Sequence, residues 1–268
     1  MVRDERRRAL NQNFLVDPGV IEALVRSSGV SRGDLVLDIG AGSGLITLAL
    51  LRRGARVIAM ERDAELAARL RAKCDPSARD RLTVVSGDVL TLPLPREHFQ
   101  VVANIPFGIT TGILHRLLDD PAGTLTRADV IVQAEVARKR GTDGRGTLLN
   151  ACWEPWFELR AGARVPATAF RPRPRVDAAV LIARRRDEPI LAPSLRRDYT
   201  RFVTATFKRA KPSVLSAVGV PRARFAEVGG TLGFRADVLP SELSVEQWAG
   251  LFRAMAMKIR DGSGRRRG

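Results

Sequence analysis

The sequence predicts an α/β fold, in which a parallel sheet carries helices on both faces and a small α-helical domain follows. Three features of the chain support this prediction. Apolar runs alternate with helical segments up to about residue 160, a glycine-rich loop joins the first apolar run to the next helix, and positive charge is concentrated after residue 160. Alternating strands and helices favour a parallel sheet, because parallel neighbours are joined by crossovers that pack on the sheet faces.

The first domain, expected over residues 1–184, opens with a helix. Asp17 suits the N-cap of that helix, and Pro18 suits its first turn. Five apolar strands then alternate with three helices. The expected strands are 35–39, 56–61, 82–85, 99–103 and 129–132, and the expected helices are 45–51, 64–73 and 112–118. A proline-rich stretch around residues 166–174 is expected to be a linker or a returning edge strand, before a last strand over 176–183.

A second domain is expected over residues 185–260. It contains three helical segments, at 194–208, 222–228 and 244–259. Ser244 and Gln247 have the spacing of a capping box at the start of the third. The remaining tail, 261–268, consists mainly of glycine and arginine and is predicted to be disordered.

The charge distribution indicates which part of the chain meets a polyanion. Residues 1–159 hold 22 Lys+Arg against 20 Asp+Glu, whereas residues 160–268 hold 23 against 9. The net charge of +16 therefore comes almost entirely from the C-terminal part. Such a basic surface binds phosphate backbones through counterion release. We expect an RNA-binding role for this part of the chain.

Other classes of protein are not indicated. Cys74 and Cys152 lie far apart and outside any Cys/His cluster, so neither a disulfide framework nor a metal site is expected. No apolar run approaches the length of a membrane span, and the N-terminal residues do not resemble a signal peptide. We expect a cytoplasmic protein that works as a monomer.

The loop after the first strand predicts a cofactor site. The strand ends in Asp38 and Ile39, and Gly40, Gly42 and Gly44 lead into the next helix. Glycines in such a loop allow positive φ angles and close approach of a ligand to the backbone. The spacing is GxGxG, and Leu45 stands where the third glycine of the dinucleotide-binding fingerprint GxGxxG belongs. The loop therefore favours S-adenosylmethionine (SAM), which has no phosphates, over a dinucleotide.

Two acidic residues at neighbouring strand ends complete the predicted cofactor site. Glu61 ends the second strand and is placed to accept hydrogen bonds from the two ribose hydroxyls of SAM. Asp88, after the third strand, is placed to accept from the adenine amine. Arg62 and Val89, beside them, are predicted to contact the cofactor as well. A helix N-cap for Glu61 and an ordinary turn for Asp88 remain the alternative interpretations.

The residues after the fourth strand predict the chemistry. Asn104, Ile105, Pro106 and Phe107 follow that strand directly, at the sheet edge where open α/β folds bind ligands. An adenine amine is a poor nucleophile because its lone pair is delocalised into the ring. The Asn104 side-chain carbonyl and the Ile105 backbone carbonyl can accept hydrogen bonds from the two N–H groups of this amine. Phe107 can stack on an extruded base. The alternative is an ordinary turn with a buried phenylalanine.

With these motifs the chain resembles the Erm-type rRNA adenine N6-methyltransferases, relatives of the KsgA/Dim-type small-subunit rRNA dimethyladenosine transferases. The resemblance spans nearly the whole chain; one departure is Asp38, where many members carry Glu. It implies that the segment Asn11, Gln12, Asn13, Phe14 and Leu15 closes over SAM and that Phe170 walls the target-base pocket. The plausible phosphate contacts are Arg6, Arg7, Arg8, Arg171, Arg173, Arg175, Lys208, Arg209 and Lys211.

Ile105 and Phe107 favour the Erm type, since the small-subunit type usually has Asn-Leu-Pro-Tyr. The resemblance then implies methylation of one adenine in the peptidyl-transferase loop of 23S rRNA, either naked or in early assembly particles. The consequence would be resistance to macrolide, lincosamide and streptogramin B antibiotics. Small-subunit dimethylation, a non-catalytic RNA-binding role and DNA adenine methylation remain alternatives.

Overall fold

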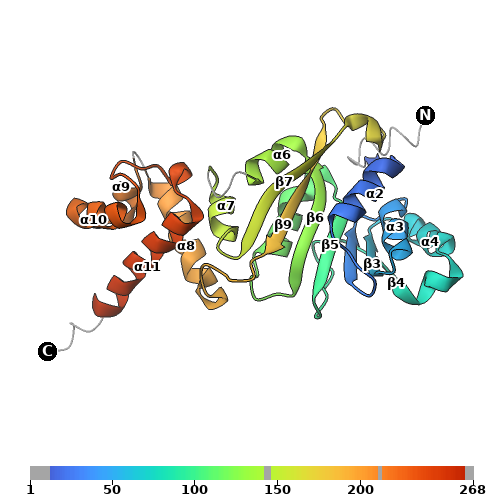
Figure 1. The fold of residues 1–268 in the computed structure, drawn as a ribbon, viewed down its shortest axis with the longest axis horizontal. Coiled ribbons are helices and arrows are strands. Elements are labelled where there is room, and N and C mark those ends of the chain that lie inside the picture. The colour runs from blue at the N-terminus through green and yellow to red at the C-terminus, as the bar shows by residue number, and fades with distance from the viewer. Residues whose placement is uncertain (1–12, 142–145, 211–212, 263–268) are drawn as a thin grey trace. The chain divides into compact units, whose positions relative to one another are not determined.

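The computed structural model describes residues 13–141, 146–210 and 213–262, with side chains up to residue 255. The chain divides into two compact units (Figure 1). The first comprises residues 1–141 and 160–185, and the second comprises residues 142–159 and 186–268. The sequence-based boundary at residue 184 places residues 146–159 in the first domain, whereas in the structure they group with the C-terminal helices.

A seven-stranded sheet forms the centre of the first unit. Its strand order is β4-β3-β2-β5-β6-β9-β7. The strands are β2 (Leu35–Ile39), β3 (Arg56–Glu61), β4 (Leu82–Ser86), β5 (Phe99–Asn104), β6 (Leu125–Gln133), β7 (Phe157–Val165) and β9 (Ala178–Arg185). The five predicted strands from β2 to β6 are present and pair in parallel, as expected.

The prediction of a parallel sheet is wrong for its last part. β9 pairs antiparallel with β6, and β7 occupies the edge. No crossover helix separates β7 from β9, and without one the chain is not constrained to return in the same direction. The sheet is therefore mixed.

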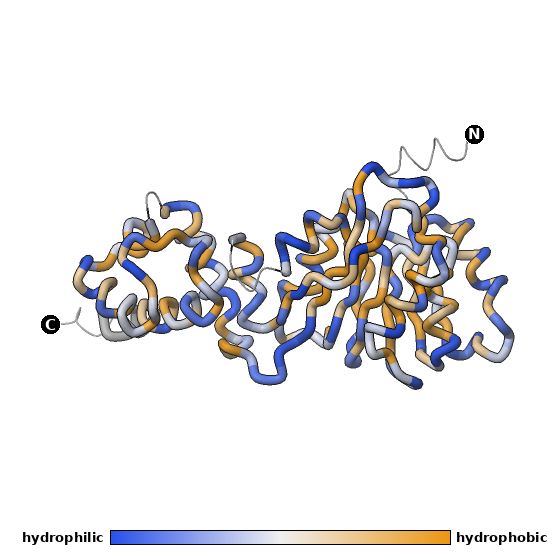
Figure 2. Tube along the Cα trace, turned by 45° about the horizontal axis from the view of Figure 1, so that its top comes forward, coloured by the Kyte–Doolittle hydropathy of each residue, from blue (hydrophilic) through white to orange (hydrophobic). Residues whose placement is uncertain are grey.

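Helices cover both faces of the sheet. Every residue of β2 is buried, which requires cover on both sides. A continuous core joins α2 (Pro18–Ser27) and α3 (Leu45–Arg52) to one face of the strands, and α4 (Ala64–Lys73) packs on β3 and β4. The predicted N-cap is confirmed, because the Asp17 side chain accepts hydrogen bonds from the backbone N–H groups of Gly19 and Val20. Figure 2 shows the hydrophobic residues concentrated along the central strands.

Several short elements were missed by the sequence pattern. They are α6 (Ala134–Arg140), α7 (Leu148–Trp153), the edge strand β7 and, in the second unit, α9 (Val214–Val218). The three helices span at most two turns, too few for a hydrophobic period to be recognised. A two-stranded sheet was missed as well, in which β1 (Phe14–Leu15) pairs antiparallel with β8 (Phe170–Arg171). The linker between β7 and β9 thus reaches the N-terminal segment.

The second unit is helical. Its helices after α7 are α8 (Arg196–Arg209), α9, α10 (Arg222–Leu232) and α11 (Val245–Gly262). Tyr199 and Phe202 of α8 meet Trp248 and Phe252 of α11 through aromatic contacts. The capping box is confirmed: the Gln247 N–H donates to the Ser244 hydroxyl, and the Ser244 N–H donates to the Gln247 side chain. α11 reaches Gly262, so residues 261 and 262 are helical, and the rest of the predicted tail lies outside the described residues.

None of the helices in the described part of the chain is long and apolar enough to cross a membrane.

Candidate active site

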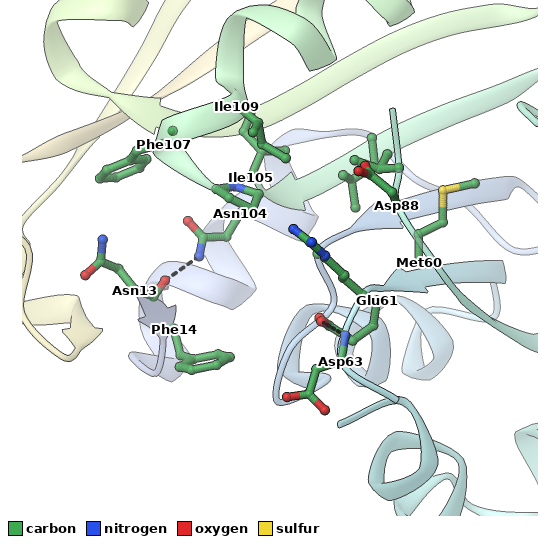
Figure 3. Close-up of a pocket in the computed structure, with 17 residues that line it drawn as sticks. Asn13, Phe14, Met60, Glu61, Asp63, Asp88, Asn104, Ile105, Phe107 and Ile109 are labelled. Carbon is green, nitrogen blue, oxygen red and sulfur yellow. Dashed lines mark hydrogen bonds between the residues drawn. The ribbon is translucent and has the colours of Figure 1, made fainter. Parts of the chain in front are cut away.

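A cavity of about 660 Å³ lies at the carboxyl ends of β2, β3 and β5, within the first unit. Its volume is in the range of small-molecule sites, and its position is the one that open α/β folds use for ligands. Figure 3 shows its side chains converging from several elements. The lining residues are Asn13, Phe14, Ile39, Gly40, Met60, Glu61, Arg62, Asp63, Gly87, Asp88, Val89, Asn104, Ile105, Pro106, Phe107, Gly108 and Ile109.

The glycine loop has the left-handed backbone that the sequence predicted. Gly40, Gly42 and Gly44 have φ angles of 72°, 54° and 80°. A Cβ atom on Gly42 would lie 2.7 Å from the Phe14 ring, so a side chain cannot be added there without displacing that ring. Gly44 is the N-cap of α3 and has no side-chain cap. Only Gly40 of the three lines the cavity; Gly42 and Gly44 support the loop behind it.

Glu61 connects this loop to the end of β3. Its Oε2 accepts a hydrogen bond from the Gly42 N–H at 2.7 Å, and its Oε1 accepts from the Asp63 N–H at 2.8 Å. The residue is 6% exposed and lines the cavity. A carboxylate has about four acceptor positions, so each oxygen retains capacity for a further donor. The structure thus gives Glu61 a loop-holding role in addition to its predicted ligand role.

Asp38 lies beneath the loop and does not line the cavity. Its Oδ2 accepts from the Thr47 hydroxyl at 2.6 Å, and its Oδ1 is buried without a hydrogen-bond partner among the described residues. Burial is the main reason that the pKa of Asp38 is raised to about 7; the Thr47 hydrogen bond opposes this shift, and the charge of Glu61 adds to it. Asp38 was expected to belong to the cofactor site. In the structure it lies behind the glycine loop and supports that loop instead of facing the cavity.

We expect Asp38→Asn to stabilise the protein in a pH-dependent way. Between pH 3.8 and about 7 the folded protein keeps the Asp38 proton and the unfolded chain loses it, so stability falls as pH rises through this window. The neutral amide avoids that loss. At about pH 8 the free energy of unfolding should rise by up to about 4 kcal/mol, and the gain should vanish near pH 4. Urea denaturation at several pH values measures this; a gain that does not depend on pH contradicts it.

The Asn104 segment lies opposite the loop. The Asn104 Nδ2 donates to the Asn13 backbone carbonyl at 2.8 Å, and its Oδ1 is buried without a partner in the described part of the chain. Pro106 rests against Gly40, since a Cβ there would lie 3.4 Å from the Pro106 Cδ. The Ile105 side chain is buried, whereas Phe107 is half-buried at the cavity wall. An unsatisfied acceptor next to an aromatic ring suits a planar ligand that carries N–H donors.

Asp88, Val89 and Arg62 occupy the cavity walls, as predicted for cofactor contacts. The Asp88 Oδ1 also accepts from the Leu90 N–H at 2.9 Å, in the manner of a turn residue. Val89 is buried and Arg62 is exposed. Both interpretations of Asp88 are therefore compatible with its geometry.

The N-terminal segment and the Phe170 segment meet beside the cavity. Asn13 and Phe14 line it, whereas Leu15 is buried in the core behind them. Phe170 is fully buried and contacts the edge of Phe107, with ring centroids 6.5 Å apart and planes at 67°. Phe170 is thus not among the lining residues but supports Phe107 from behind.

The predicted phosphate contacts divide between the units. Arg171, Arg173 and Arg175 are exposed in the first unit, and Lys208 and Arg209 are exposed at the end of α8 in the second. The remaining predicted site residues lie outside the described residues; they are Arg6, Arg7, Arg8, Asn11, Gln12 and Lys211.

Sequence reasoning missed part of the lining. Asp63 donates its N–H to Glu61 and caps α4 through hydrogen bonds from Glu65 and Leu66. Its position between a strand and a helix is a recognisable N-cap signal. Ile109, 36% exposed at the cavity, gave no such signal, because a single isoleucine before a helix is compatible with core packing.

Comparison with known proteins assigns the family. The sequence model of the family described as "Ribosomal RNA adenine dimethylase" matches residues 3–255. An rRNA adenine N-6-methyltransferase of Aeromicrobium erythreum is 37% identical over 257 residues, which cover 94% of this chain and 74% of that protein. The mycinamicin-resistance protein MyrB of Micromonospora griseorubida is 36% identical over 250 residues, which cover 92% and 78%.

A solved structure supports the same assignment. The crystal structure of the 23S rRNA methyltransferase ErmE matches with a TM-score of 0.80 and 32% identity, over 91% of this chain and 100% of that one. The predicted α/β fold, which is the Rossmann-like fold of SAM-dependent methyltransferases, and the resemblance to Erm-type enzymes are thereby confirmed. The chain belongs to the ribosomal RNA adenine dimethylase family.

Proposed function

We propose that this protein methylates N6 of one adenine in the peptidyl-transferase loop of 23S rRNA, with SAM as the methyl donor, and thereby confers macrolide, lincosamide and streptogramin B resistance. The central observation is the buried, unpartnered Oδ1 of Asn104 beside the cavity. The matched relatives include a protein named for mycinamicin resistance and a 23S rRNA methyltransferase. The enzyme would act as a cytoplasmic monomer, on naked rRNA or on early assembly particles.

The residues around the cavity fit SAM. Gly40 presents backbone rather than a side chain to the cavity, and Glu61 retains acceptor capacity for two hydroxyls. Asp88 offers a carboxylate and Val89 an apolar surface for an adenine. SAM supplies a methyl group on a sulfonium sulfur. The protein's contribution is to hold the acceptor nitrogen in line with that group.

Asn104 and Ile105 would orient the target amine. The Oδ1 of Asn104 and the backbone carbonyl of Ile105 accept hydrogen bonds from the two N–H groups of the adenine amine. The lone pair of the amine nitrogen then points away from both oxygens. The same two oxygens stabilise the positive charge that develops on the nitrogen during attack. Phe107, supported by Phe170, stacks on the adenine once this base has flipped out of the RNA helix. The quaternised nitrogen is acidic enough to lose a proton to water, so no general base is required.

α8 provides a candidate surface for the RNA backbone. Arg197, Arg201 and Lys208 are exposed and lie four and seven residues apart, which places them on one side of the helix. The buried residues Tyr199 and Val203 face the opposite side. Arg201 also pairs with the exposed Asp198 at 3.8 Å, so the unopposed positive charge of this side lies toward the end of the helix, at Lys208. Exposed cations on one side of a helix suit phosphates.

We expect the double variant Lys208→Ala/Arg209→Ala to bind 23S rRNA about 10-fold more weakly, with the slope of log affinity against log salt reduced by about two. Filter binding at several salt concentrations gives both values. Arg52→Ala is the matched control, because Arg52 is an exposed cation already paired with Glu22. An unchanged salt slope in the double variant contradicts the assignment of these residues.

The function is tested with tritiated SAM and two separate substrates, protein-free 23S rRNA and protein-free 16S rRNA. We expect label in 23S rRNA alone, recovered after digestion as N6-methylated adenosine. Label only in 16S rRNA would establish the small-subunit activity instead, and SAM binding without label in either RNA would favour a non-catalytic role.

A further inference from the structure

We propose that the backbone carbonyl of Asn13 sets which end of the Asn104 carboxamide faces the target base. Strand β1 then acts as a positioning element for methyl transfer. This inference rests on the proposed function, in which the Asn104 oxygen accepts a hydrogen bond from the adenine amine. The inference concerns the Asn13 carbonyl, which bonds to the nitrogen of the Asn104 carboxamide and not to its unpartnered oxygen.

The contact joins residues that are remote in sequence. The Asn104 Nδ2 donates to the Asn13 backbone oxygen at 2.8 Å across 91 residues of chain. Figure 3 shows this bond and shows the Asn104 amide oxygen on the side away from the Asn13 carbonyl. That oxygen is buried and lacks a partner among the described residues. The carboxamide is therefore held at its nitrogen, with its oxygen available.

Such a contact is needed because a carboxamide has nearly the same shape in its two orientations. Its oxygen accepts hydrogen bonds and its nitrogen donates them, so a flip by 180° exchanges the two functions with little steric change. A flipped Asn104 would direct N–H groups at the N–H groups of the adenine, which cannot be methylated in that arrangement. A backbone carbonyl can only accept. The Asn13 oxygen therefore favours the productive orientation and opposes the other.

The Asn13 carbonyl is fixed by the strand that follows it. Phe14 and Leu15 pair with Arg171 and Phe170, and the Val16 N–H donates to the Ala169 carbonyl at 2.9 Å. Leu15 anchors the strand in the core. The position of the carbonyl is thus set by tertiary structure rather than by local turn geometry.

The same strand touches the other parts of the site. The Phe14 ring lies where a Cβ on Gly42 would be, against the cofactor loop, and β8 carries Phe170, which supports Phe107. The segment that closes on the glycine loop is therefore the one that orients Asn104. Docking of β1 makes the acceptor oxygen available at the same time as it completes the cavity wall.

The variant Asn104→Asp tests this inference through its pH dependence. A protonated carboxyl has the shape and polarity of the carboxamide: its hydroxyl can donate to the Asn13 carbonyl, and its other oxygen can accept from the adenine. An ionised carboxylate cannot donate and would place a negative oxygen against that carbonyl. We expect the rate of the variant, divided by the wild-type rate, to fall about tenfold per pH unit above the pKa of the introduced carboxyl.

The other charged groups near the site are the same in both proteins. Those at the cavity are Glu61, Arg62, Asp63 and Asp88; Asp38 lies on the adjacent strand β2, and Arg171 lies opposite Phe14. Division by the wild-type rate at each pH removes their effect to first order. SAM affinity is measured by calorimetry at the same pH values, so that a change in cofactor binding is not taken for a change in transfer.

The opposite result overturns the inference. If the ionised carboxylate simply served as a stronger acceptor, the rate ratio would rise with pH. A flat ratio, or no transfer at any pH from a folded variant that binds SAM, has the same consequence. Wild-type protein that fails to methylate either rRNA would contradict the proposed function rather than this inference.

A second measurement does not depend on the variant. In the wild-type protein, one of the two Asn104 side-chain N–H protons should exchange with water at least tenfold more slowly than those of an exposed asparagine, because it is bonded to the Asn13 carbonyl. Amide NMR of protein labelled at asparagine reads this directly. Exchange of both protons at the rate of a free amide overturns the inference even if the Asn104→Asp protein does not fold.

Discussion

Replacement of Asn104 by alanine is expected to slow methyl transfer by about 100- to 1,000-fold while SAM affinity stays within about threefold of wild type. The expected factor is the one seen when a single preorganised hydrogen-bonding group is removed from a developing charge. Alanine removes the Oδ1 that has no other partner in the described structure, and it leaves Glu61 and the glycine loop in place. The effect should therefore fall on transfer rather than on binding.

Single-turnover assays with 23S rRNA, together with SAM titration by calorimetry, separate the two quantities. Gln100→Ala is a matched control, since Gln100 lies on the same strand, is half-buried and bonds to Asp34 away from the cavity. It should transfer at the wild-type rate. Turnover by Asn104→Ala within about tenfold of wild type would contradict the role of the carboxamide.

Glu61→Gln is expected to weaken SAM binding by about 10- to 100-fold, which corresponds to about 1.4–2.8 kcal/mol. The two Glu61 oxygens each accept from one backbone N–H, those of Gly42 and Asp63. The amide of glutamine has only one oxygen, so its NH₂ group must face one of these donors. Such a pairing leaves a buried donor unsatisfied and displaces either the glycine loop or the start of α4.

The loss should appear in the dissociation constant for SAM and, at saturating SAM, much less in the transfer rate. Glu65→Gln is the matched control, because Glu65 is an exposed carboxylate on α4 that pairs with Arg69. A dissociation constant for Glu61→Gln within twofold of wild type would show that neither hydrogen bond supports the cofactor site.

The local pattern of the sequence was enough to predict the strands β2 to β6 and the loop that follows β2. Strands buried on both faces are continuous apolar runs, and the glycines after β2 stand where the backbone has positive φ angles. Parallel pairing then brings the carboxyl ends of β2, β3 and β5 to one edge of the sheet. The convergence of Gly40, Glu61 and Asn104 therefore follows from their positions at strand ends.

The local sequence pattern was not enough to predict contacts between segments far apart in the chain or the shortest elements. The antiparallel return of β9, the edge position of β7 and the packing of α7 with α8 depend on which strand or helix is available after collapse. The burial of Phe170 behind Phe107 was missed for the same reason. Proline and arginine in that segment describe its local stiffness and charge but do not specify its neighbour.

By itself the sequence determined the type of fold and the positions of the glycine loop and of Asn104 at strand ends, because each is encoded by neighbouring residues on one strand and its following loop. The contact of Asn104 with the adenine amine stays a prediction. Only the tertiary structure decided that Asp38 lies behind the loop, that Glu61 holds Gly42, and that the Asn13 carbonyl holds Asn104 by its nitrogen. These contacts depend on the direction of single hydrogen bonds between distant segments, and that direction exists only once the segments have packed.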